Sequence, residues 1–345
     1  HPLRLLYHRL KAMVAAVIYG FPANGMVVIG VTGTNGKTTT VNLIANILAK
    51  GGDKVGMTST VGFRIGDEKW VNDTKQSTVS PFALQKLLKR MRAAGCKYAV
   101  LEVTSHAVTQ SRILGINFDV AVVTNVTADH IEYHGNFNNY LDAKGGLFRK
   151  VSKGKRKFGV PKVIVLNADD EYFGYFDRFV ADQKVNYGLK SATVYAEQVV
   201  SKPAGSEFIL HVPNNAVAVN INLPGDYNVY NSLAAAAACM ALGVPLSLIA
   251  EGLRDSAVVP GRFEHVEAGQ DYAVIVDYAH TTDALLNLLK LYRGLTPGRL
   301  FLVFGATGGG RDKMKRPKMG EVADEFADYI IVTDDDPYEE DELEI

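Results

Sequence analysis

The chain has 345 residues, of which 47% are apolar and 21% charged, and its formal net charge at pH 7 is zero. This composition is typical of a globular protein, and at about 150 residues per domain the length predicts two to three domains. The balanced charge gives no indication of nucleic acid or an anionic membrane as a partner. No apolar stretch is long enough to span a bilayer, and we expect a cytoplasmic protein.

The first residues, 3–19, predict a helix that ends at Gly20 and Pro22. The sequence Tyr19–Pro22 is not a small-residue cleavage site, so this stretch does not resemble a signal peptide. The two cysteines, Cys96 and Cys239, are far apart in apolar surroundings, which favours buried thiols over a disulfide or a metal site.

The stretch from Val27 to Thr40, VVIGVTGTNGKTTT, organises the first half of the chain. Its apolar start predicts a buried parallel strand, its glycines a turn, and Lys37 the start of a helix. Strand, glycine turn and helix form the context of a phosphate-binding loop, in which backbone N–H groups and a lysine contact phosphates. Because Val31 occupies the first glycine position of the general pattern, the alternative is a structural corner that contains Gly-Lys-Thr.

Strands and helices alternate after this loop. The predicted elements are a strand at 54–60, a hairpin at 61–71, a helix at 82–94 and strands at 98–103, 119–124 and 163–166. Polar residues follow three of these strands: Glu102, Thr124-Asn125 and Asn167–Asp170. The alternation predicts an α/β fold with a doubly wound parallel sheet, which binds ligands at the carboxyl ends of its strands.

In residues 184–223 the alternation of strands and helices gives way to a different sequence pattern. Short alternating runs at 193–199, 207–212 and 217–223 predict a small antiparallel sheet, followed by an alanine-rich helix. After a boundary near 258–261, α/β alternation resumes and predicts the first part of a second, Rossmann-like domain. We therefore expect an entry helix at 1–25, a central nucleotide-binding domain at 26–258 and a C-terminal domain at 259–345.

Two strand ends carry candidate metal ligands. Glu102, in LEVTSHA, follows a strand beside the phosphate loop and can hold Mg²⁺, although a structural carboxylate is the alternative. Asp129-His130, in TNVTADHIEYHG, lies at a neighbouring strand end and favours His130 as a second ligand. We interpret His134 as structural.

Several other patterns have mainly structural interpretations. Helical Lys144 by itself predicts a surface residue, and Asn228 and Asn231 share a helix face that favours capping over recognition of a base. The basic run 149–157 favours a solvated loop over a polyphosphate site. The run 308–316 is either an anion cradle or a solvated basic loop, and the acidic run 334–344 either a tail or an amine site.

Together these motifs resemble the Mur ligase family, most closely its MurE type, which adds the third residue of the peptidoglycan stem peptide. The resemblance extends from about Tyr7 to Asp341. Its motifs, in chain order, are GTNGKTTT, EVTSHA, TNVTADHIEYHG, YLDAKGGLF, LNADD, LPGDYNVYN, VPGRFE, VDYAHTTDAL, GGGRDKMKRPKMG and TDDDP.

The resemblance implies an ATP-dependent carbon–nitrogen ligase that uses ATP and Mg²⁺ and forms an acyl phosphate. Its implied substrates are a UDP-MurNAc-peptide and a free amino acid. Its implied role is in peptidoglycan and cell wall biogenesis, and thus in cell shape and cell division. We expect a monomer. Implied ATP-binding residues are Gly33, Thr34, Asn35, Gly36, Lys37, Thr38, Thr39, Asn228, Asn231, Arg262 and Asp277.

The remaining implied roles concern the metal and the acceptor. Implied metal ligands are Thr38, Glu102, His130 and a carbamate on Lys144, and Lys37, Glu102, His130 and Lys144 are the implied catalytic residues. Implied substrate-binding residues are Thr78, Thr104, Gln110, Arg112, Arg311, Asp335, Asp336 and Tyr338. His280 is a further candidate, for deprotonating the incoming amine.

Two departures of the sequence from the family pattern bear on the substrate and on the domains. Tyr338 stands where diaminopimelate-adding members often have the Arg of DNPR, and Tyr cannot pair bidentately with a distal carboxylate. We therefore expect lysine or another amine rather than diaminopimelate. The usual N-terminal UDP-binding domain is expected to be absent, and the C-terminal domain incomplete.

Two other functions remain open from the sequence. Folylpolyglutamate synthetases and cyanophycin synthetases share much of this pattern and are also ATP-dependent ligases. A nucleotide-binding module without ligase activity is the alternative from a different class of function.

Overall fold

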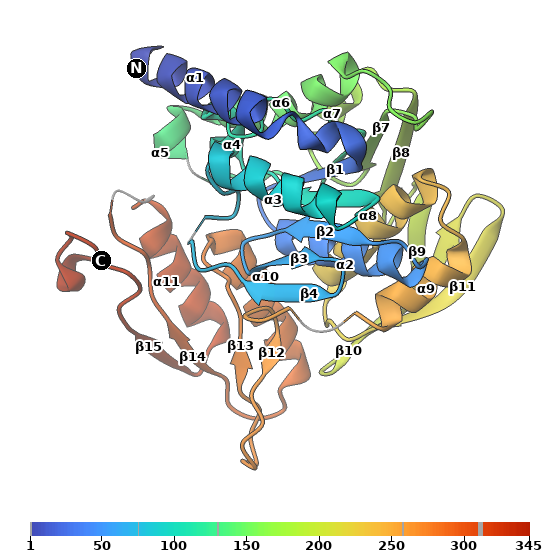
Figure 1. Cartoon of the computed structure of the whole chain (residues 1–345). Helices are drawn as coiled ribbons and strands as arrows, with labels where there is room; N and C mark the ends of the chain where they lie inside the picture. The colour runs from blue at the N-terminus through green and yellow to red at the C-terminus, as the bar shows by residue number, and fades with distance from the viewer. Residues whose placement is uncertain (1, 75, 130, 257–258, 310–312) are drawn as a thin grey trace.

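The structure is a computed structural model that describes residues 2–74, 76–129, 131–256, 259–309 and 313–345. Within these residues, eleven strands form one sheet in the order β11-β10-β9-β8-β7-β6-β1-β5-β2-β3-β4. Helices cover both faces of this sheet, and the C-terminal residues form a smaller part below it in the view of Figure 1. The predicted mixed α/β class is confirmed.

The middle of the sheet is parallel. Its parallel strands are β1 (Val27–Thr32), β2 (Val55–Thr58), β5 (Tyr98–Glu102), β6 (Val120–Val123), β7 (Val163–Asn167) and β8 (Gln183–Gly188). Nearly all their side chains are buried, because helices pack on both faces.

Antiparallel strands extend the sheet at both ends: β3 (Gly62–Ile65) and β4 (Glu68–Val71) at one, and β9 (Val194–Lys202), β10 (Gly205–Val212) and β11 (Asn215–Ile221) at the other. The predicted small antiparallel region is therefore present. It is continuous with the parallel strands, because β9 pairs in parallel with β8, with Val194 opposite Tyr187.

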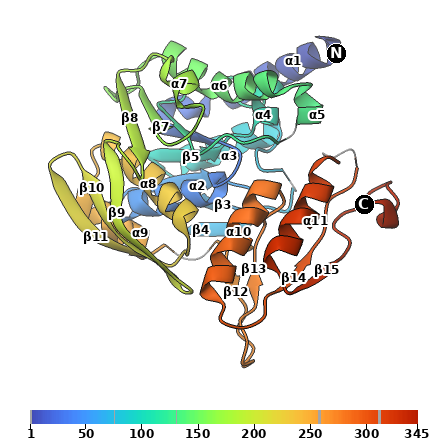
Figure 2. The ribbon, with the colours of Figure 1, turned by 180° about the vertical axis from the view of Figure 1, so that it is seen from behind.

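Helices form the two outer layers. They are α1 (Pro2–Tyr19), η1 (Pro22–Gly25), α2 (Lys37–Lys50), α3 (Pro81–Ala93), α4 (Ser105–Thr109), α5 (Ile131–His134), α6 (Phe137–Lys153), α7 (Phe173–Asp177), α8 (Asp226–Ala241) and α9 (Leu246–Arg254). One core lies between the sheet and α2, α8 and α9, and a second lies between the opposite face and α3, α6 and α7 (Figure 2). Buried alanines along α8 allow it to approach the sheet closely.

The C-terminal part contains two short sheets. Its elements are β12 (Glu264–His265), β13 (Ile275–Val276), α10 (Thr282–Leu295), β14 (Phe301–Phe304), α11 (Lys315–Phe326), β15 (Tyr329–Val332) and η2 (Glu342–Glu344). β14 and β15 are parallel, whereas β12 and β13 are antiparallel. A small core that includes Leu285, Leu302 and Met319 holds the two long helices against β14.

Three further observations concern predictions made from the sequence. The run 149–157 is not a solvated loop throughout, because its first five residues complete α6 and Lys157 is only 9% exposed. Cys96 and Cys239 are buried free thiols, as expected. Among the helices of the described residues, none has the length and apolarity required to cross a membrane.

Candidate functional site

The carboxyl ends of β1, β5 and β6 meet at one edge of the sheet. Val31 of β1 lies opposite Glu102 of β5, and Thr32 lies opposite Val123 of β6. The residues that follow these strands therefore gather at this edge, as predicted for a parallel sheet.

The phosphate loop needs its two glycines. Gly33 and Gly36 have φ angles of 150° and 80°, which disfavour other residues. A Cβ on Gly33 would lie 1.8 Å from Thr124 Oγ1, and one on Gly36 would lie 2.1 Å from Asn231 Oδ1. The backbone at the start of α2 is thus free of side chains, which is the arrangement that binds phosphates through N–H groups.

Lys37, the first residue of α2, places a cation beside this loop. Its Nζ donates a hydrogen bond to Thr34 O at 2.7 Å. Burial lowers the pKa of Lys37, while the carboxylates of Glu102 and Asp129 oppose that shift. Both carboxylates therefore lie near the ammonium group.

Glu102 is 1% exposed and is held by neutral donors. Its Oε2 accepts hydrogen bonds from Thr38 Oγ1 and the Thr60 N–H, and its Oε1 accepts one from Thr60 Oγ1, each at 2.9 Å. None of the ion pairs found in the described ranges involves Glu102. Its negative charge is thus available to a ligand cation.

The residues present fit Mg²⁺. His130 lies outside the described residues, and among those described no group of three or more His, Cys, Asp or Glu side chains is placed to hold a metal. The carboxylates of Glu102 and Asp129 and the hydroxyl of Thr38 are nevertheless oxygen donors of the kind that hold Mg²⁺ together with substrate phosphates. Asp129, 7% exposed, was named in the sequence only as the neighbour of His130.

Lys144 is not a surface residue, so that interpretation of the sequence was wrong. Its side chain is 2% exposed, and Nζ donates a hydrogen bond to Gly33 O at 2.5 Å. Burial and the nearby ammonium of Lys37 hold the pKa of Lys144 well below its usual value, although Asp129 and Asp170 oppose this. The structure thus brings two lysines together at the phosphate loop.

Tyr140 joins α6 to the same loop and was missed by the sequence analysis. Its hydroxyl lies 2.8 Å from Thr34 Oγ1, which also donates to Thr127 O and accepts from the Thr127 N–H, both at 3.0 Å. The hydroxyls of Tyr140 and Thr34 therefore share one hydrogen bond, in which either of them can be the donor. Its position one helical turn before Lys144 was the available signal.

Asn228 and Asn231 do not cap α8, so that interpretation is corrected. The N-cap residue is Gly225, and both asparagines are buried within the helix. Asn228 Nδ2 donates to Pro224 O at 2.8 Å, and Asn231 Nδ2 donates to Asn228 Oδ1 at 3.2 Å. The second asparagine lies against Gly36 and thus beside the phosphate loop.

A hydrogen bond connects the C-terminal part to this site. Asn35 Nδ2 donates to Asp283 Oδ2 at 3.0 Å. The guanidinium of Arg262 lies 4.5 Å from the centre of the Tyr278 ring, and its buried Nε has no hydrogen-bond partner among the residues that the structure describes. Asp277, whose pKa is raised by burial, accepts from the Phe263 N–H at 3.0 Å. The unpartnered Nε is suited to an anionic ligand.

Four of the implied substrate-binding residues form one network: Thr78, Thr104, Gln110 and Arg112. Thr78 Oγ1 accepts from the Thr104 N–H at 3.1 Å, and Arg112 donates to Thr78 O. Arg112 also holds Gln110 Oε1 at 2.7 and 3.0 Å. Because Thr78 Oγ1 donates to Glu102 O at 2.8 Å, this network adjoins the edge of the sheet that carries Glu102.

The implied amino-acid loop lies in the C-terminal part, and its Arg311 is outside the described residues. Asp335 accepts from Thr307 Oγ1 at 3.0 Å. Tyr338 is 61% exposed and adjoins Gly309, and both Asp336 and Tyr338 have positive φ angles. The structure does not place Asp335 or Tyr338 in contact with the phosphate loop.

The two charge runs of this part bind one another. Glu340, from the acidic run, pairs with Lys313 at 2.9 Å and with Arg316 at 3.0 Å. Lys315 donates to His280 O at 2.8 Å. The described basic side chains of the run 308–316, which was predicted as an anion cradle or a solvated loop, are therefore bound within the C-terminal part.

The fold and this site define a nucleotide-binding α/β protein with a phosphate loop and an adjacent acidic edge. Residues 31–239 match the Mur ligase middle domain, and residues 261–345 match the domain described as "Mur ligase, glutamate ligase domain". The chain belongs to the Mur ligase family, whose members are ATP-dependent ligases.

Named relatives agree with this assignment. The chain is 43% identical over 98% of its length to a UDP-N-acetylmuramoyl-L-alanyl-D-glutamate–2,6-diaminopimelate ligase of Geobacillus thermodenitrificans, and covers 68% of that protein. It is 42% identical over 97% of its length to a UDP-N-acetylmuramyl-tripeptide synthetase of Roseiflexus sp., and covers 67% of it. A solved diaminopimelate ligase structure matches 92% of the chain at 32% identity, with a TM-score of 0.69; the chain spans 63% of that structure.

Proposed function

We propose that this chain catalyses the ATP-dependent addition of an amino acid to the stem peptide of a UDP-MurNAc-peptide in the cytoplasm, as a step of peptidoglycan synthesis. The observation that carries the proposal is the convergence of Lys37, Lys144 and Glu102 on the phosphate loop. The two lysines are suited to the negative charge of a triphosphate, and the carboxylate of Glu102 is suited to a cation. The family of the chain supports the same reaction.

In the first proposed step, a carboxylate oxygen of the acceptor attacks the γ-phosphorus of ATP. A new O–P bond forms, the bond to the β-phosphate oxygen breaks, and ADP leaves. Lys37, the N–H groups at the start of α2 and Arg262 counter the charge that develops on the transferred group.

In the second step, the amine of the amino acid attacks the acyl carbon. The tetrahedral intermediate expels inorganic phosphate, and the former amine loses a proton. Burial lowers the pKa of His280 to about 4, so its imidazole is uncharged near neutral pH. His280 is thus a candidate to receive the proton, although its low pKa makes it a weak base.

Thr38, Glu102 and Asp129 would hold Mg²⁺, and His130 is the further ligand that the family resemblance implies. When bound, this ion neutralises phosphate charge. The low pKa of Lys144 favours its neutral amine, which is the form that adds to CO₂. In that addition an N–C bond forms and a proton is released, so the neutral amine becomes an anionic carbamate beside Gly33 of the phosphate loop.

The amino acid is the finer part of the proposal. Asp335 and Asp336 would favour a second amino group on the substrate, and Tyr338 cannot replace an arginine in binding a distal carboxylate. This chemistry favours lysine. The relatives named as diaminopimelate ligases do not support that preference, so turnover with the two amino acids must be compared directly.

Release of inorganic phosphate tests the proposal. The chain is mixed with ATP, Mg²⁺ and UDP-MurNAc-L-Ala-D-Glu, with lysine, diaminopimelate or no amino acid, and the product is identified by mass spectrometry. We expect amino-acid-dependent phosphate release and a product with one added residue. Lys37→Met should reduce turnover by at least about 100-fold, whereas the exposed Lys86→Met should not.

The other two functions give different results in this assay. Turnover with a folate or an aspartate polymer instead of the muropeptide would assign the chain to another ligase of the superfamily. Binding of ATP without phosphate release from any acceptor and amino acid would identify a non-catalytic module and would contradict the proposal.

A further inference from the structure

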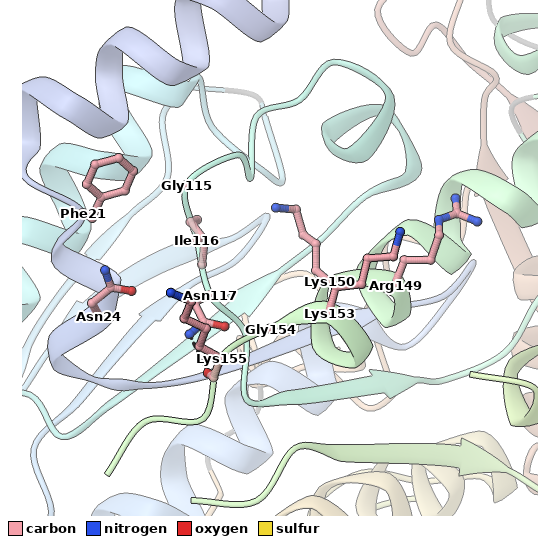
Figure 3. A pocket seen from close by; sticks show the side chains of 10 residues that line it. All are labelled: Phe21, Asn24, Gly115, Ile116, Asn117, Arg149, Lys150, Lys153, Gly154 and Lys155. Carbon is pink, nitrogen blue, oxygen red and sulfur yellow. Dashed lines mark hydrogen bonds between the residues drawn. The ribbon is translucent and has the colours of Figure 1, made fainter. Parts of the chain in front are cut away.

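A pocket of about 580 Å³ lies at the opposite edge of the sheet from the phosphate loop. Its lining comes from residues 21–24, which precede β1, from residues 115–117, which precede β6, and from the end of α6. Figure 3 shows Phe21 and Asn24 on the left, Ile116 and Asn117 in the middle, and the long basic side chains of α6 on the right. The pocket is therefore separate from the site described above.

The charge of the lining is entirely positive. Arg149, Lys150, Lys153 and Lys155 contribute cations, and the lining contains no Asp or Glu. Arg149 is already paired with Asp142 at 2.7 Å, outside the pocket. Lys150 is half-buried and has no hydrogen bond or ion pair within the part of the chain that the structure describes. Burial lowers its pKa, and no carboxylate opposes that shift.

A second layer of positive charge lies behind the pocket. The buried ammonium groups of Lys157 and Lys162 share the single carboxylate of Asp119, at 2.8 and 2.9 Å. Asn117, in the lining, accepts from both: its main-chain O from Lys157 at 2.7 Å and its Oδ1 from Lys162 at 3.1 Å. One carboxylate for two lysines leaves an excess positive charge, and its field extends into the pocket because the intervening protein screens it weakly.

The end of a helix attracts lysines without any ligand, because its carbonyl groups carry partial negative charge. That effect accounts for the exposed Lys153. It does not account for Lys150, since a half-buried cation without a carboxylate is costly unless an anion reaches it. The side-chain amide of Asn24, also without a hydrogen bond in the described residues, supplies a further donor at the same pocket.

We propose that this pocket binds a phosphate group, either as free inorganic phosphate or as part of a small phosphorylated molecule. Lys150 and Lys153 provide the charge, Asn24 provides a hydrogen-bond donor, and the ring of Phe21 forms an apolar wall. This site is independent of the phosphate loop and of the proposed ligase reaction.

Calorimetric titration tests the proposal. Inorganic phosphate, pyrophosphate and AMP are titrated separately into the chain carrying Lys37→Met, which weakens binding at the phosphate loop, and the three arms distinguish free from substituted phosphate. We expect at least one of them to bind, and Lys150→Met to weaken that binding by about tenfold or more, because a charge-assisted hydrogen bond is lost. The matched control Lys86→Met, at an exposed position outside the pocket, should leave the affinity unchanged.

Lys150→Met should fold, because it removes an unpaired, half-buried cation, and we expect its Tm to equal or exceed that of the parent. Asn24→Asp is a second variant of nearly equal volume that places a negative charge in the pocket, and it should also weaken binding. No binding by any of the three probes, or equal affinities in Lys150→Met and Lys86→Met, would overturn the proposal.

Discussion

Two pairs of lysines lie at opposite edges of the same parallel strands. At the amino edge, Lys157 and Lys162 share Asp119, and Lys157 also donates to three main-chain carbonyl groups, those of Ala23, Met26 and Asn117. At the carboxyl edge, Lys37 and Lys144 each donate to a carbonyl group of the phosphate loop, and neither forms an ion pair within the described residues.

The difference distinguishes a pair that stabilises the fold from a pair to which the proposed function assigns a role in ligand binding. The pair at Asp119 finds its counter-charge and most of its hydrogen-bond acceptors within the protein. The pair at the phosphate loop lies close to Glu102 and Asp129, the ion pairs found among the described residues join it to neither, and burial lowers the pKa of both lysines. A buried cation without a protein counter-charge lowers stability, and at a catalytic site this cost accompanies function.

The largest expected effect is on the amino-edge pair. Asp119→Asn leaves two ammonium groups without their carboxylate and also alters the acceptor of the Val28 N–H. Removing one partner of a buried ion pair typically costs about 3–5 kcal/mol. We therefore expect the free energy of unfolding, measured in urea near neutral pH, to fall by about that amount.

Lys144→Met is the matched variant at the carboxyl edge. It replaces a buried amine that forms no ion pair within the described residues by an apolar side chain of similar length, so stability should stay equal or rise while amino-acid-dependent turnover is lost. If Lys144→Met lost as much stability as Asp119→Asn, the two pairs would be equivalent and the comparison would fail.

A smaller effect is expected at Tyr140, whose hydroxyl shares a hydrogen bond with Thr34 of the phosphate loop. Tyr140→Phe keeps the ring and removes one hydrogen bond worth about 0.5–1.5 kcal/mol. We expect KM for ATP to rise about 2- to 10-fold with a smaller change in kcat, measured by phosphate release. Tyr175→Phe, which loses a bond to the exposed Asp142, is the control; equal kinetic changes in both variants would count against the role of Tyr140.

A further effect is expected on the pH dependence of stability. The pKa of His280 is lowered from 6.5 to about 4 by burial. Between these values the unfolded state binds more protons than the folded state, so stability falls as the pH falls through this range. His280→Asn should lose less stability than the parent between about pH 7 and about pH 5, measured by urea midpoints. Equal losses would show that His280 does not titrate as described.

The sequence predicted most of the fold from local patterns. The alternation of apolar runs with amphipathic stretches located β1, β5, β6 and β7 and the helices α2 and α3, because parallel strands are apolar on both faces. It did not predict β8 as a parallel strand or the continuity of β9 with it, since pairing between strands depends on long-range contacts. The short α4, α5 and α7 also lacked a sufficient periodic signal.

The site was predicted in part. Lys37 and Glu102 follow from glycine spacing and strand ends, which are local features. Lys144, Asn228 and Asn231 were misinterpreted from their local pattern, because their burial arises from packing α6 and α8 against a loop more than 100 residues away. Asn35 and Asp283 illustrate the same limit, since only the docked C-terminal part brings them together.

The close approach of Gly33 to Thr124 limits how this protein can be redesigned. With only 1.8 Å between Thr124 Oγ1 and the position of a Cβ on Gly33, residues 31–40 cannot be transplanted as a cassette. A recipient scaffold must leave space for Thr124 at the end of β6. A library that varies residues 31–40 must keep Gly33 and Thr124 constant. Engineering of nucleotide specificity would therefore begin from both segments at once.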